Sequence, residues 1–145
     1  MGASLYIQRS NGVYADSPIA TVDLALEAYD SIPWRDEFEH FSSLSHEERN
    51  GKDPEFGLIN DSGRIIRIFP YSLEWTAFTY SYPILEALDG SQEARFVTDS
   101  LPAALTHDLI RLYFSPDHRP ILKLLNDYPN SQNSNTAEQG AAPNP

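Results

Sequence analysis

The chain has no cysteine among its 145 residues, which excludes disulfides, thiolate zinc sites and cysteine nucleophiles. It has no apolar run near the ~18 residues that a membrane-spanning helix needs. The first residues also lack the basic and then apolar order of a signal peptide. From these absences we expect a cytoplasmic protein that has no membrane partner.

Sequence motifs for chemistry are missing as well. There is no G-x-S-x-G nucleophile elbow and no glycine-rich phosphate or dinucleotide motif. The Asn60-Asp61-Ser62-Gly63 stretch resembles half a calcium loop, but no glutamate follows at the required spacing, so we interpret it as a turn. We therefore predict no intrinsic catalysis, no metal and no cofactor.

Basic residues are scarce. Ten Lys and Arg stand against 21 Asp and Glu, which gives a formal net charge of -11. The densest acidic stretch contains Asp36, Glu37, Glu39, Glu47, Glu48, Asp53 and Glu55. Such a field repels phosphate backbones and attracts basic surfaces, so it argues against nucleic acid and favours a basic protein partner.

Length and composition predict one globular domain over residues 1–128, because 41% hydrophobic content is enough for a core. Residues 129–145 are polar and lack core-forming side chains. We expect a disordered tail there, whose deletion leaves the melting temperature unchanged within about a degree or two.

The order of elements predicts an α+β fold in which helices pack mainly on one face of an antiparallel sheet of about four to five strands. The clearest signal is a hairpin over residues 56–69, with a turn at Asn60–Gly63. A strand over 5–8 with a short return at Val13 and Tyr14, and helices over 22–31 and 34–44, come before it. Thr21 is the expected N-cap of the first helix.

After the hairpin we expect a strand over residues 74–82, a short helix over 84–88 and a strand over 94–98. A helix capped by Asp99 or Ser100 then runs to about Phe114, and a last helix covers 120–125. The strand over 74–82 carries many aromatic side chains. One of its faces should enter the core, and the other should meet either a helix or a binding partner.

His46, Glu47 and Glu48 with Asp53 are the strongest candidates for a metal or acid–base site. No second histidine follows His46 at the spacing of a zinc protease, so a solvated acidic loop is the preferred interpretation.

Three segments resemble the small acidic immunity proteins of bacterial toxin systems: the strand Ser4–Gln8, the helix end Ile32-Pro33-Trp34, and the hairpin Phe56–Ile68. The resemblance implies a protein that binds and blocks a cognate basic toxin by occlusion, as a monomer or weak homodimer. An acidic secretion chaperone and a small enzyme that uses the carboxylates near His46 remain alternatives.

We predict that the seven acids of residues 36–55 form the partner-binding surface, with Trp34 and Trp75 as apolar anchors. The competing interpretation is that these acids only keep the domain soluble.

Overall fold

The computed structural model describes residues 3–19, 21–84 and 93–129. The α+β prediction is confirmed: one antiparallel sheet has the strand order β2-β1-β3-β4-β5-β6. Its strands are β1 (Ala3–Gln8), β2 (Tyr14–Ile19), β3 (Glu55–Asn60), β4 (Ile65–Pro70), β5 (Trp75–Pro83) and β6 (Glu93–Pro102). The sheet has six strands, slightly more than predicted.

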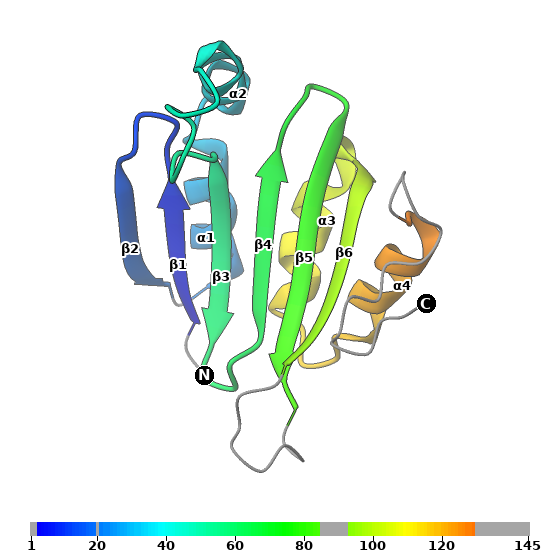
Figure 1. The fold of residues 1–145 in the computed structure, drawn as a ribbon. Coiled ribbons are helices and arrows are strands. Elements are labelled where there is room, and N and C mark those ends of the chain that lie inside the picture. Colours follow the sequence, from blue (N-terminus) through cyan, green and yellow to red (C-terminus); the bar gives the residue numbers. More distant parts are fainter. Residues whose placement is uncertain (1–2, 20, 85–92, 130–145) are drawn as a thin grey trace.

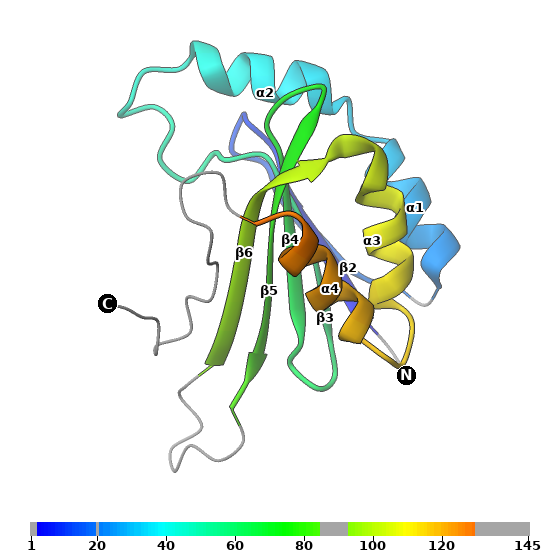
Figure 2. The same ribbon diagram turned by 90° about the vertical axis from the view of Figure 1, so that its right-hand side faces the viewer.

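Four α-helices accompany the sheet in the described part of the chain: α1 (Val22–Asp30), α2 (Trp34–Ser43), α3 (Thr106–Tyr113) and α4 (Arg119–Asp127). Figures 1 and 2 show α1, α3 and α4 on one face of the sheet, as predicted, while α2 lies across one end. None of the helices in the described ranges is long and apolar enough to cross a bilayer.

The core lies between the sheet and these three helices. Ile66 and Ile68 of β4 point into it, whereas Ile65, Arg67 and Phe69 alternate away, as the period of two requires. The large apolar side chains of the strands and helices that are fully buried are Phe56, Leu58, Ile66, Ile68, Phe78, Tyr80, Leu101, Leu109, Ile110 and Ile121.

Two local predictions are confirmed at the level of single hydrogen bonds. The Thr21 hydroxyl accepts a hydrogen bond from the Leu24 amide at 3.2 Å and so caps α1. In the β3–β4 turn the Asn60 side-chain oxygen accepts from the amides of Ser62 and Arg64. Gly63 follows with φ +78°, a conformation that favours glycine.

Three boundaries differ from the predictions. β2 extends to Ile19 although Pro18 lacks a donor, because an edge strand needs hydrogen bonds on only one side. β6 runs on to Pro102, so neither Asp99 nor Ser100 caps a helix, and α3 begins at Thr106 after a 3-10 turn. All but the first residue of the helix predicted over 84–88, and most of the predicted tail, lie outside the described residues.

Candidate functional site

The predicted acids gather at the end of the sheet that α2 crosses. α2 carries Asp36, Glu37 and Glu39, and the segment from α2 to β3 carries Glu47, Glu48 and Asp53. The β1–β2 and β4–β5 turns lie at the same end (Figures 1 and 2). The strand directions explain why these segments lie together, because in an antiparallel sheet every second turn lies at the same end.

Glu37 serves the fold at this end. Its two carboxylate oxygens accept hydrogen bonds at 2.7 Å from the Arg9 guanidinium and the Ser10 amide, and the residue is buried. Burial alone would raise the pKa of Glu37, but these hydrogen bonds outweigh it and hold the pKa below its usual value. Glu37 thereby ties α2 to the β1–β2 turn.

Glu55 is also occupied within the protein. Its carboxylate accepts a hydrogen bond from the Tyr6 hydroxyl and lies 3.8 Å from the Arg67 guanidinium. Burial raises the pKa of Glu55, against the opposing effect of both neighbours. The Tyr6 ring lies directly over Gly57, where a Cβ atom would come within 2.0 Å of the ring.

The other five acids, Asp36, Glu39, Glu47, Glu48 and Asp53, are exposed. Glu48 makes a local contact, since it and Ser45 exchange hydrogen bonds between side chain and backbone. His46, Glu47 and Asp53 line an open depression on the surface. Within the described residues, no three His, Asp or Glu side chains are placed so that they could hold a metal ion.

The two predicted anchors differ in exposure. Trp34 packs on Tyr29, with ring centroids 5.1 Å apart, and its indole N–H donates to the Tyr29 carbonyl at 2.8 Å. Trp75 is 43% exposed. Other exposed apolar side chains lie in or beside the two turns of this end: Val13, Tyr14, Tyr71 and Leu73. We call the five exposed acids, these four side chains and Trp75 the acidic end.

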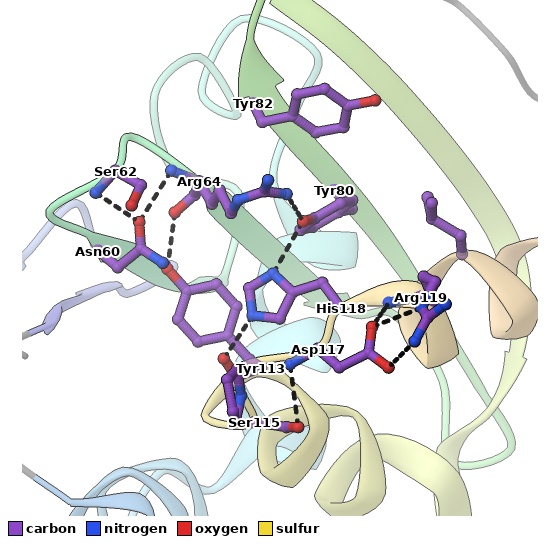
Figure 3. Close-up of a pocket in the computed structure, with 12 residues that line it drawn as sticks. Asn60, Ser62, Arg64, Tyr80, Tyr82, Tyr113, Ser115, Asp117, His118 and Arg119 are labelled. Carbon is purple, nitrogen blue, oxygen red and sulfur yellow. Dashed lines mark hydrogen bonds and ion pairs between the residues drawn. The ribbon is translucent and has the colours of Figure 1, made fainter.

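A second site lies at the opposite end, on the helix-covered face (Figure 3). A cavity of about 670 Å³ opens between the β3–β4 turn, β5 and the corner from α3 to α4. We call it the Arg64 pocket, after its central residue. Its main polar lining residues are Arg64, Tyr80, Tyr82, Tyr113, His118 and Arg119.

A directed chain of hydrogen bonds crosses this pocket. His118 Nε2 lies 2.8 Å from the Tyr113 carbonyl, which can only accept, so this nitrogen carries the proton. In the neutral ring Nδ1 then accepts from the Tyr80 hydroxyl at 2.8 Å. Arg64 donates to the oxygen of the same hydroxyl at 2.5 Å. Nε2 thus holds the His118 ring against α3, and Nδ1 holds the Tyr80 hydroxyl to which Arg64 donates.

Aromatic rings complete the pocket. The Arg64 guanidinium lies over the Tyr82 ring, 5.0 Å from its centroid. The Tyr113 hydroxyl donates to the Arg64 carbonyl at 2.6 Å and thereby joins α3 to the turn. At the rim, hydrogen bonds from Arg119 lower the pKa of Asp117 to about 2. The arrangement can bind an anion, because its central cation faces neutral groups.

Sequence reasoning missed this pocket. Tyr80 and Tyr82 lie in the strand over 74–82 whose aromatic side chains the sequence shows, but the sequence does not connect them with Arg64 or His118. The one usable signal is their spacing of two, which places both tyrosines on the same face of β5.

Comparison of the chain with protein-family models, with curated proteins and with solved structures gives no match.

Proposed function

We propose that the protein binds a basic protein partner through its acidic end and blocks that partner by occlusion, the role of an immunity protein. The observation that carries the proposal is the joint exposure of acids and large apolar side chains at one end of the sheet. Acids that serve only solubility would not need apolar neighbours of this size.

The charges would act at long range. Residues 36–55 hold seven acids against Arg49 and Lys52, so this segment supplies much of the net charge of -11. A field of one sign speeds the encounter with an oppositely charged partner, and salt screens the effect. Glu37 and Glu55 add to the field but make their contacts inside the protein.

The apolar groups would supply the short-range part of the binding energy. Leu73 is 64% exposed, and Trp75 and Tyr71 accompany it in and beside the β4–β5 turn. Large aromatic side chains that become fully desolvated dominate the energy of many interfaces. Trp75 therefore replaces Trp34 as the expected anchor, since Trp34 already packs on Tyr29.

The edges of the sheet favour a monomer over the dimeric chaperone alternative. β2 is an edge strand that contains Asp16 and Pro18, and both residues disfavour pairing with another strand. At the other edge, the Thr98 hydroxyl of β6 donates to the Tyr128 carbonyl at the end of α4. A mass measurement by size-exclusion chromatography with light scattering separates the alternatives, and a stable dimer would favour the chaperone.

The direct test uses the product of the neighbouring gene as the candidate partner. We expect a one-to-one complex and inhibition of that product's activity. A double variant that carries Asp36→Lys and Glu47→Lys should associate about tenfold or more slowly, because two of the charges that attract the partner are reversed. The matched control is Asp23→Lys with Glu27→Lys, which reverses two exposed acids of α1. Equal rates for all three proteins would refute binding through the acidic end.

A further inference from the structure

We propose that the Arg64 pocket is a binding site for a small organic anion, a molecule with one phosphate or carboxylate group joined to an apolar or aromatic body. Binding there needs no protein partner and does not involve the acidic end, which lies at the other end of the sheet (Figure 1).

The first reason is the charge environment of Arg64. Six of the eight arginines form an ion pair with Asp or Glu within the described part of the chain. Arg49 instead donates to two backbone carbonyls. Arg64 has neither arrangement, since its side chain meets a phenol oxygen and a ring face. In a chain with twice as many acids as bases, a cation left beside neutral groups is suited to an anion from outside.

The second reason is that Arg64 is already held in position. One guanidinium nitrogen donates to Tyr80, which His118 holds in turn, and the group lies over the Tyr82 ring. A guanidinium has five N–H donors, so several remain for a ligand. A side chain that is fixed before binding loses little conformational entropy on binding, and this raises affinity.

The third reason is the size and lining of the cavity. A volume of about 670 Å³ lies in the range of small-molecule sites. The hydroxyls of Ser62 and Ser115 line it beside Arg64, and Leu122 supplies an apolar wall. A phosphate or carboxylate would meet the guanidinium in the two-pronged geometry that arginine favours, and the body of the ligand would lie on the apolar side.

The carboxylate of Asp117 does not oppose this assignment. Both of its oxygens accept hydrogen bonds from the Arg119 side chain at 2.9 Å. The pair is exposed at the rim and is close to neutral as a unit.

The test is isothermal titration calorimetry of the full chain with phenyl phosphate and benzoate, which separate the two kinds of oxyanion. Phenol and inorganic phosphate serve as controls, because each represents one half of phenyl phosphate. We expect at least one of the two anions to bind with a dissociation constant of about 1 mM or lower. Phenol alone and inorganic phosphate alone should each bind about tenfold more weakly than phenyl phosphate, or not at all.

Arg64→Gln should weaken binding about tenfold or more, because it removes a charge-assisted hydrogen bond. The matched control is Arg111→Gln, on the exposed surface of α3 and outside the pocket, which should bind like the wild type. Ser62→Glu provides a second variant at an exposed position, where an added carboxylate should repel the anion without altering Arg64. The proposal is overturned if neither anion binds with a dissociation constant of about 1 mM or lower, or if both pocket variants bind as tightly as the control.

Discussion

The two ends of the sheet differ in the sign of their charged groups and in what surrounds them. At the end that α2 crosses, the buried Glu37 is paired with Arg9 and Ser10, and exposed acids and exposed apolar side chains lie at the same end. At the other end a cation, Arg64, is surrounded by tyrosines and a histidine. The comparison shows two uses of charge. At one end Glu37 stabilises the fold and the exposed acids form a surface, whereas in the Arg64 pocket the guanidinium is positioned to bind a ligand.

The largest expected effect comes from Glu37→Gln. The change keeps the size of the side chain but removes a buried charge and leaves Arg9 without its carboxylate. We expect a loss of about 2–4 kcal/mol of unfolding free energy at neutral pH, measured by urea denaturation. Glu39→Gln is the control, since its exposed pair with Arg35 is worth about 0.5 kcal/mol or less.

The effect of Glu37 should also depend on pH. The folded-state pKa of Glu37 is lowered, so its stabilisation is complete above the unfolded-state pKa of about 4.3. It is lost as the pH falls from there through the folded-state value. The difference in stability between wild type and Glu37→Gln should therefore shrink steadily below about pH 4. A difference that stays constant down to pH 2 would mean that the carboxylate charge is not what stabilises this end.

A smaller effect is expected on the sheet face opposite the helices, where Gly57 lies under Tyr6. An added methyl group would overlap the ring, so Gly57→Ala should cost about 1–3 kcal/mol in thermal or chemical unfolding. Combination with Tyr6→Ser should recover part of the loss. If Gly57→Ala is as stable as the wild type, the Tyr6 ring does not lie over Gly57. The hydrogen bond from Tyr6 to Glu55 would then also be in question, and Glu55 would be available to a partner.

The smallest stability effect is expected in the pocket. Tyr80→Phe removes the hydroxyl that joins Arg64 to His118, and we expect a loss of about 1 kcal/mol. The affinity for phenyl phosphate or benzoate should fall at the same time, because Arg64 loses one of its two supports. Unchanged affinity would show that the hydroxyl does not position the guanidinium.

Local patterns were sufficient to predict most of the fold. The Asn60–Gly63 turn and the alternation in β4 identified the central hairpin, because both depend on residues that are close in sequence. The start of α3 was predicted wrongly. Leu101 fits the apolar period of a helix, yet it belongs to β6, where pairing with Thr76 of β5 determines its conformation. Contacts between strands overrode the local pattern there.

The candidate sites were predicted unevenly for the same reason. The acidic stretch can be recognised directly, although its sequence does not show that Glu37 pairs with Arg9, 28 residues away. The Arg64 pocket depends on partners that are farther apart: 38 residues separate Tyr80 from His118, and 49 separate Arg64 from Tyr113. No short pattern joins such residues, and only the crossing of α3 and α4 over the sheet brings them together.

The central claim is that the two ends bind different kinds of partner independently, and one kinetic measurement tests it most directly. The rate of association with the neighbouring gene's product would be measured at about 50 and about 500 mM salt. We expect added salt to slow the wild type and Arg64→Gln equally, by about tenfold or more, and to affect the Asp36→Lys, Glu47→Lys variant much less. Equal salt dependence in all three proteins, or slower association of Arg64→Gln alone, would contradict the account.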